Sequence, residues 1–372
     1  MSEDRNLGVV ARNPSESAER HTGLVFLLIF GMLAAGIVAI GYLAYRNYEN
    51  RYRAEVDRQL SAIAELKVGE LKQWRKDRRE DGAILFKNAA FSDLVRRFLE
   101  NPADADAERQ LQAWLGKYQA HDQYDKVRLQ DAQGITRLSV PAGLPAVSTT
   151  VAKNAAEVLR SGQVTFQDFF RSEHDQQIRL GILVPILDGQ DDGRPLGTVF
   201  LRIDPNIYLY PFIKRWPISS PTAETLLVHR EGNDVVFLNE LRFQANAALN
   251  LRFPLDRTAL PAAQAVLGLG EVMDGFDYRD KPVVAAVRTI PDSPWSLVAK
   301  MDIAEVYAPM RERLWQIIFM VAVLLFAAGA GVGWVWRQQK IKFYQEQYRM
   351  SEANGTKLRD KILRELNLQV QP

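Results

Sequence analysis

The residues best suited to bind a small molecule lie in the middle of the chain. Asp168 and Arg171 fall at the end of one β-type run, Arg179 lies on the next run, and Arg128 lies on an earlier run. Arg pairs bidentately with carboxylates, so a pocket with these groups beside aromatic rings suits a small organic acid or zwitterion. The aromatic members of this candidate ligand-binding set lie on or after a preceding helical stretch: Trp114, Tyr118 and Tyr124.

The same residues also have ordinary structural interpretations. Asp168 and Arg171 would form an ion pair, and the aromatic side chains would belong to the core. Metal binding and catalysis have less support, because the chain has no cysteine, no G-x-S-x-G, no H-E-x-x-H and no P-loop. The four histidines share no ligand spacing: His21, His121, His174 and His229. We therefore expect no metal, no cofactor and no catalytic residues.

The composition is that of an ordinary globular region joined to apolar helices. Charged residues make up 25% of the chain and the net charge is +2. A nucleic-acid-binding protein usually carries a strongly basic face, so no nucleic-acid partner is expected.

Two long apolar runs, one near each end of the chain, contain no charged residue. They cover residues 24–45 and 314–336. At about 1.5 Å per residue each would form a helix of roughly 33–35 Å, enough to cross a hydrocarbon core of about 30 Å. The first run is longer than the apolar part of a signal peptide, so we expect two membrane helices. Nearby Lys and Arg residues favour both termini in the cytoplasm.

The region between the runs begins as helix and then changes to strands. Apolar residues recur every three or four positions over residues 46–79, which predicts a long amphipathic stalk helix. Two shorter helices are expected around Phe91–Leu99 and Glu108–Tyr118, separated by the break at Asn101 and Pro102.

Six elements then occur twice in the same order, strand-strand-helix-strand-strand-strand. The first set covers residues 126–203 and the second covers residues 225–301. Both helices end near a glycine, at Gly162 and Gly270, and a strand follows each one. This duplication predicts an α+β fold with two tandem PAS-like modules, each built on an antiparallel sheet.

Several segments resemble the double Cache (tandem PAS-like) periplasmic sensor region of bacterial transmembrane sensor histidine kinases. The matching segments are Trp216–Thr225, Arg230–Arg242, Asp277–Arg279 and Ser293–Lys300. The resemblance implies an inner-membrane receptor whose periplasmic sensor binds a small ligand and signals to a cytoplasmic output. Residues 124–129 do not match the aromatic-Arg-x-Trp pattern of the amino-acid-binding subset of this family.

The resemblance and the patterns together divide the chain into eight segments. The expected bounds are a cytoplasmic tail 1–23, a membrane helix 24–45, a stalk helix 46–79, a membrane-distal module 80–213, a membrane-proximal module 214–302, an exit helix 303–313, a second membrane helix 314–336 and a cytoplasmic helical stub 337–372.

The expected partners are a small-molecule ligand, the lipid bilayer and a second copy of the chain. Dimer contacts would run through the stalk, the membrane helices and the stub, where Ile341, Tyr344 and Tyr348 favour a coiled coil broken at Asn354 and Gly355. Gly329 and Gly333 form a G-x-x-x-G in the second run. Whether the protein is an enzyme stays open, because no catalytic domain is present. Alternatives are part of a diguanylate cyclase or chemoreceptor, or a module that binds another periplasmic protein.

Overall fold

The computed structural model describes residues 14–120, 124–143, 147–191 and 193–368. The chain forms two compact units. One unit is Ala54–Tyr307, and the other combines Met1–Arg53 with Ala308–Pro372. The expected tail 1–23 lies partly outside the described residues.

Two long helices carry the apolar runs. They are α1, Pro14–Phe86, and α8, Ala308–Leu368, and each contains a stretch long and apolar enough to cross a membrane. In the terminal unit the two helices pack closely at Gly41, where a Cβ atom would lie 2.8 Å from Val321. Two apolar helices flanking the mixed region were predicted, and the structure confirms them.

The break expected at Asn354 and Gly355 is wrong, because α8 continues through both residues. One Gly inside a helix costs only about 1 kcal/mol relative to Ala. The flanking residues are mostly good helix formers, so this cost does not end the helix. The apolar residues expected to form a coiled coil, Ile341, Tyr344 and Tyr348, are exposed in the single chain, and so are Leu358 and Ile362 after the expected break.

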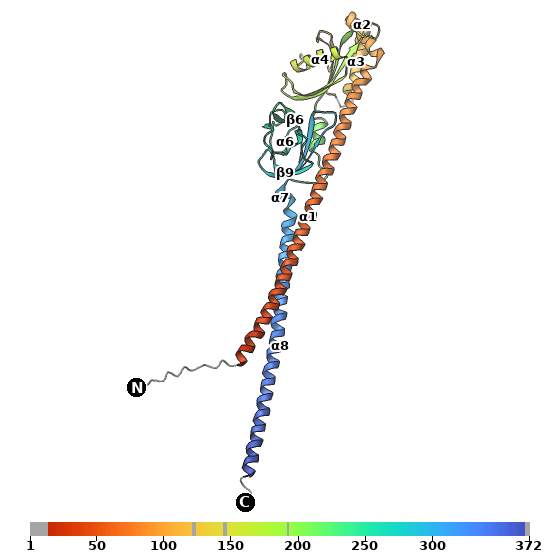
Figure 1. The fold of residues 1–372 in the computed structure, drawn as a ribbon. Helices are drawn as coiled ribbons and strands as arrows, with labels where there is room; N and C mark the ends of the chain where they lie inside the picture. Colours follow the sequence, from red (N-terminus) through yellow and green to blue (C-terminus); the bar gives the residue numbers. More distant parts are fainter. Residues whose placement is uncertain (1–13, 121–123, 144–146, 192, 369–372) are drawn as a thin grey trace, which may run out of the picture. The chain divides into compact units, whose positions relative to one another are not determined.

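The first sheet has five strands in the order β2-β1-β5-β4-β3, all antiparallel (Figure 1). Its strands are β1 Lys126–Asp131, β2 Thr136–Val140, β3 Thr165–Arg171, β4 Ile178–Leu187 and β5 Pro195–Ile203. The first and last strands of the set are therefore neighbours at the centre of the sheet.

The second sheet repeats this arrangement with one additional edge strand. Its order is β8-β7-β6-β11-β10-β9. The strands are β6 Glu224–Glu231, β7 Asp234–Phe237, β8 Arg252–Pro254, β9 Val272–Phe276, β10 Pro282–Thr289 and β11 Trp295–Asp302. The predicted α+β class with two antiparallel sheets is confirmed, and β8 is the strand that sequence reasoning missed.

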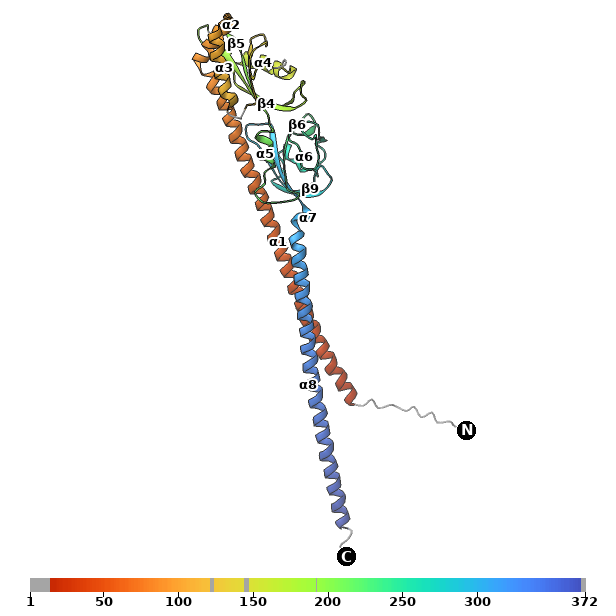
Figure 2. The ribbon, with the colours of Figure 1, turned by 180° about the vertical axis from the view of Figure 1, so that it is seen from behind.

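Short helices cover the sheets. In the first sheet α4 lies on one face, and α2 and α3 lie on the other (Figures 1 and 2). On the second sheet α6 packs against β6, β10 and β11. The bounds are α2 Ala89–Glu100, α3 Ala105–Ala120, α4 Thr149–Ser161, α5 Leu209–Lys214, α6 Pro261–Val266 and α7 Ile303–Val306.

Local capping explains where α4 begins and ends. The Ser148 hydroxyl accepts a hydrogen bond from the backbone N–H of Val151 at 3.4 Å, which satisfies a free donor of the first turn. Gly162 ends the helix with φ 67°, a conformation that costs glycine little because it has no Cβ. These caps fix the position of α4 over the sheet.

The stalk part of α1 is tied to the chain between the two sheets by a buried lysine. Lys67 donates hydrogen bonds to the carbonyls of Phe212, Ile213 and Arg215 at 3.2, 3.0 and 2.7 Å. A cation is favoured where the last carbonyls of a helix are free, here at the end of α5. Burial lowers the pKa of Lys67 to about 8.

Candidate ligand-binding cavity in the first sheet

Three cationic side chains share one face of the first sheet. Successive residues of a strand point to opposite faces, so Lys126 and Arg128 of β1 point to the same side. In the antiparallel pair of β1 and β5, Lys126 lies directly opposite Arg202, and Arg128 lies opposite Phe200. Like charges directly opposite each other are unfavourable in a sheet. The three cations therefore give this part of the sheet face a concentrated positive charge.

Helix α4 covers only part of this face. Val151, Ala155 and Val158 of the helix pack on Phe170, Leu183 and Phe200 and form a small apolar core. Beside that core the structure leaves a cavity of about 290 Å³. Its lining is Lys126, Arg128, Val147, Ser148, Val151, Phe170, Ser172, His174, Asp175, Phe200 and Arg202.

A glycine shapes the floor of the cavity. A Cβ atom at Gly181 would lie 2.4 Å from the carbonyl oxygen of Leu201 and 2.6 Å from the Phe200 ring. Only glycine therefore lets the Phe200 ring lie across β4. The ring gives the cavity an apolar surface beside its cationic groups, which is the usual composition of a small-molecule site.

Some of the charges around the cavity are neutralised by neighbouring carboxylates. Arg202 forms an ion pair with Asp125, and its Nε donates to Asp125 at 3.0 Å. Arg179 lies beside the cavity and pairs with Asp175 at 3.0 Å and Asp204 at 3.2 Å. These two arginines therefore face three carboxylates.

Lys126 and Arg128 are different, because neither has an ion-pair or hydrogen-bond partner in the described part of the chain. The Arg128 side chain is nevertheless buried, with 6% of its surface exposed. Counting Arg179 and Arg202, four cations meet three carboxylates, so the site has an excess positive charge. A buried cation without a partner is unfavourable, and a bound anion would remove that cost.

The pKa values of the two unpaired cations reflect this environment. Burial lowers the pKa of Arg128, and the nearby positive charge of Arg202 lowers it further. The pKa of Lys126 is lowered by the same two causes in the same order. The pKa of Asp175, which lines the cavity, is also lowered, because hydrogen bonds from Ser172 and Gln177 outweigh the effect of burial.

The aromatic residues of the candidate ligand-binding set lie elsewhere. The Tyr124 hydroxyl donates to Asp81 of α1 at 2.6 Å, and its ring lies 6.3 Å from that of Tyr118. Trp114 packs edge-on against Phe91 of α2 at 6.0 Å. None of the three candidates lines the cavity. Their described contacts are with the helical layer of α1, α2 and α3.

Asp168 contacts the second sheet, and Arg171 contacts the segment between β7 and β8; neither lines the cavity. The Nε1 of Trp295 in β11 donates to Asp168 at 2.9 Å. Arg171 donates to the Ala248 carbonyl at 3.0 Å and to Asn250 at 3.1 Å. Of the predicted candidates, Arg128 lines the cavity and Arg179 borders it. Lys126 and Arg202 were missed, although the alternation of Lys126 with Arg128 was a usable signal.

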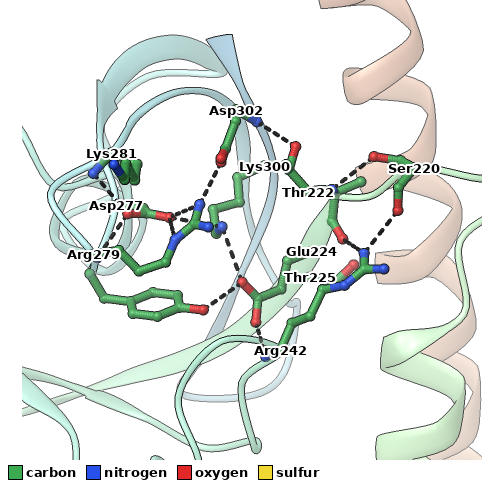
Figure 3. A network of polar contacts seen from close by, with 12 residues as sticks. Ser220, Thr222, Glu224, Thr225, Arg242, Asp277, Arg279, Lys281, Lys300 and Asp302 are labelled. Atoms are coloured by element: carbon green, nitrogen blue, oxygen red, sulfur yellow. Dashed lines mark hydrogen bonds and ion pairs between the residues drawn. The ribbon is translucent and has the colours of Figure 1, made fainter. Parts of the chain in front are cut away.

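A second group of charged residues lies in the other sheet and is closely paired (Figure 3). Lys300 of β11 is fully buried and forms ion pairs with Glu224 at 3.1 Å and Asp277 at 2.9 Å. Arg279 forms ion pairs with Asp277 at 2.6 Å and with Asp302 at 2.5 Å. We call these five residues the proximal network.

Hydrogen bonds complete the proximal network. Glu224 accepts from the Tyr278 hydroxyl at 2.9 Å and from the backbone N–H of Arg242 at 2.5 Å. Asp277 accepts from the backbone N–H groups of Arg279 and Lys281. These donors and the ion pairs hold the pKa of Asp277 below its usual value, against the opposing effect of burial. Each charged side chain of the network is therefore paired with an opposite charge within the protein.

The network also reaches the start of the exit segment. The backbone N–H of Asp302 donates to the Thr222 hydroxyl at 3.1 Å. The carboxylate of Glu305, in α7, accepts from the backbone N–H of Thr222 at 3.0 Å and from the Ser220 hydroxyl at 2.7 Å. The segment between the sheets and α7 are thus held together by charged hydrogen bonds.

Comparisons with known proteins give one matching family and several similar solved structures. A family model described as a Cache domain matches residues 45–310. The ligand-binding domain of the Pseudomonas fluorescens chemoreceptor CtaA, solved with L-serine, is 14% identical, with 67% of this chain and 98% of that chain covered and a TM-score of 0.44.

Two further solved structures are similar. The Pseudomonas aeruginosa PAO1 chemoreceptor domain PctB with L-Arg is 14% identical, covers 68% of this chain and 98% of its own, and has a TM-score of 0.46. The corresponding PctC domain with GABA is 15% identical, covers 66% and 100%, and has a TM-score of 0.45. A search of curated proteins finds no match.

Proposed function

The chain belongs to the Cache domain family, and from this premise we propose that it is a transmembrane receptor whose first sheet binds a small carboxylate-bearing ligand. Two apolar helices flank the sensor region, as in a two-pass membrane protein with an extracytoplasmic sensor. The observation that carries the ligand class is the cavity beside Lys126 and Arg128, two cations without a described partner. A ligand carboxylate supplies the missing negative charge.

The size and lining of the cavity favour a compact ligand. A volume of about 290 Å³ is at the lower end for small-molecule sites. Phe170 and Phe200 provide apolar contact, and Ser172 and Asp175 provide polar groups for an additional hydroxyl or amine. We therefore propose a short organic acid or zwitterion as the ligand.

Calorimetric titration of the full chain in nanodiscs tests this proposal. The probes are acetate, L-lactate, succinate and L-alanine, with acetamide, lactamide and succinamide as neutral analogues. We expect at least one carboxylate to bind and its amide not to bind. Arg128→Gln should weaken that binding roughly 10- to 100-fold, because a hydrogen bond to a charged group contributes about 1.5–3 kcal/mol.

Arg160→Gln is the matched control. Arg160 lies on α4, is exposed and pairs with Glu157, and it does not line the cavity. This variant removes the same charge and should bind the ligand as the wild type does. Equal binding of a carboxylate and its amide, or equal weakening by both variants, would contradict the proposed site.

We propose further that the sensor region lies in the periplasm of a bacterium and that both termini lie in the cytoplasm. The absence of cysteine makes single-cysteine labelling simple. An impermeant maleimide should label the exposed Ser219→Cys in cells whose outer membrane alone has been opened, and should label Ser351→Cys only after complete lysis. The opposite pattern would reverse the topology.

We also propose that the chain acts as a dimer. The exposed apolar residues of α8 recur at three- and four-residue spacing, which favours a two-stranded coiled coil. Tyr348→Cys should form a disulfide-linked dimer under mild oxidation, whereas Arg349→Cys, one position around the helix, should form less. Equal yields from the two variants would count against a specific coiled coil.

For the output we propose a histidine kinase of a two-component system. The support is the resemblance of four segments to sensor kinases: Trp216–Thr225, Arg230–Arg242, Asp277–Arg279 and Ser293–Lys300. An in-frame fusion of the chain to a characterised kinase core should show autophosphorylation that changes with the ligand. A response only when the chain is fused to a chemoreceptor signalling domain would favour that alternative.

A further inference from the structure

A second cavity, unrelated to the first, lies where the stalk part of α1 meets both sheets. Its volume is about 340 Å³. One wall is α1, and the other is formed by Val164, just before β3, and by Pro291 and Asp292 in the turn between β10 and β11. We call it the junction cavity. Its lining is Lys72, Arg75, Lys76, Arg79, Glu80, Ala83, Val164, Pro291 and Asp292.

Arg75 forms the buried end of the junction cavity. Its guanidinium group lies between two aromatic rings, 4.0 Å from the centroid of Phe166 in β3 and 4.1 Å from that of Trp295 in β11. Cations are attracted to aromatic faces, and the two rings fix the plane of the group. The stalk helix and both sheets therefore contribute to the position of this one side chain.

The hydrogen-bonding capacity of Arg75 is only partly used. Nη2 donates to the Asp292 carbonyl at 3.4 Å, and Nη1 is buried without a partner in the described part of the chain. The whole residue is 8% exposed. Burial lowers the pKa of Arg75 to about 10, although Asp168 and Asp292 oppose this effect. A buried guanidinium nitrogen without an acceptor carries a desolvation cost that an anion would remove.

The rest of α1 in this region adds positive charge to the same face. Lys72 and Arg79 lie three and four residues from Arg75, Lys76 lies four residues from Lys72 and three from Arg79, and all four side chains line the junction cavity. Like charges at this spacing destabilise a helix. Lys76 is 3.7 Å from Glu80, and Asp292 is the other carboxylate of the lining. Within the lining, four cations face two carboxylates, and with Asp168, which acts on Arg75 from outside the lining, one positive charge remains in excess.

We propose that the junction cavity binds a compact oxyanion with two or more negative charges, of the phosphate or polycarboxylate class. The anion accepts from Nη1 of Arg75 and is surrounded by Lys72, Lys76 and Arg79. Bound there, it contacts the stalk helix and both sheets at once. The junction cavity is thus a second input, separate from the cavity in the first sheet, that stabilises one arrangement of stalk and sheets.

The test uses the full chain in zwitterionic phosphatidylcholine nanodiscs at fixed ionic strength. Inorganic phosphate and citrate are the probes, and chloride is the reference anion. Binding is followed by calorimetry and by tryptophan fluorescence, because Trp295 contacts Arg75. All titrations are repeated with Arg128→Gln, which weakens the cavity of the first sheet and does not touch the lining of the junction cavity.

We expect saturable binding of phosphate or citrate in both backgrounds, with a rise in melting temperature that follows the anion concentration. The triple variant Lys72→Gln, Lys76→Gln, Arg79→Gln should weaken binding at least tenfold. These three side chains are at the surface, so folding should be retained. In the triple variant the fluorescence change should require an anion concentration at least tenfold higher.

The matched control removes three exposed cations elsewhere, in the variant Lys87→Gln, Arg109→Gln, Lys153→Gln. It should bind the anion as the wild type does. The proposal is overturned if neither probe binds, if Arg128→Gln alone abolishes binding, or if both triple variants weaken it equally. It is also overturned if the first triple variant changes only the dimer fraction in sedimentation, because the three cations then belong to a contact between copies.

Discussion

The two sheets have charged side chains at the same register position, but the charges are alike in the first sheet and opposite in the second. In the first sheet Lys126 of β1 lies opposite Arg202 of β5. In the second sheet Glu224 of β6, the strand equivalent to β1, lies opposite Lys300 of β11. The first position holds two cations beside a cavity, and the second holds a buried ion pair.

With the ligand site that we propose, this difference illustrates how a duplicated fold separates a binding site from a structural core. Two positions further along, Arg128 and Phe200 border the cavity, whereas Leu226 and Val298 belong to the apolar core under α6. The Glu224 carboxylate thus has the place in the second sheet that we assign to a ligand carboxylate in the first. The second module carries this anion within its own sequence, and we propose that the first takes it from solution.

The largest expected effect comes from breaking the proximal network. Lys300→Met leaves Glu224 and Asp277 buried without their shared cation, which should lower the free energy of unfolding by about 3–5 kcal/mol. Urea denaturation of the full chain in nanodiscs measures the loss. Lys281→Met is the control, because the Lys281 side chain is exposed and should change stability by less than about 0.5 kcal/mol. A loss no larger than that of the control would show that the network is not structural.

The next effect is a pH dependence of the same network. The folded pKa of Asp277 lies below its ordinary value of 3.8. Its stabilising contribution is therefore complete above that value and is lost as the pH falls through the lower folded pKa. Below about pH 4 the unfolding free energy of the wild type should fall more steeply than that of Asp277→Asn. Parallel curves for the two proteins would contradict the ionised pairing of Asp277.

A smaller effect should come from giving the first sheet the charge pairing of the second. Lys126→Glu replaces a cation opposite Arg202 with a carboxylate, as Glu224 lies opposite Lys300. Without ligand this should raise the unfolding free energy by roughly 0.5–1 kcal/mol. Lys153→Glu makes the same charge change at an exposed position of α4 and should have little effect. A destabilised Lys126→Glu would mean that the two register positions are not equivalent.

Sequence patterns predicted the elements better than the site. Apolar periodicity and turn residues identify strands and helices, because they depend on neighbouring residues. The pairing of Lys126 with Arg202 depends on the register of the first and last strands of the module, which local patterns do not contain. The direction of Asp168 depends on an irregularity in β3 between Gln167 and Phe170, which shifts the pairing with β4. Such a bulge redirects side chains and has no clear sequence signal.

A pair of calorimetric titrations, with the carboxylate that binds best in the probe panel, tests most directly whether the cations of the first sheet bind a ligand. The wild-type chain in nanodiscs should bind it, and Lys126→Glu should show at least 100-fold weaker binding, because its own carboxylate occupies the cationic site and repels the ligand. The stability of the variant should be retained in the same preparation. Undiminished binding by a folded Lys126→Glu would contradict the claim that the unpaired cations of the first sheet form the ligand site.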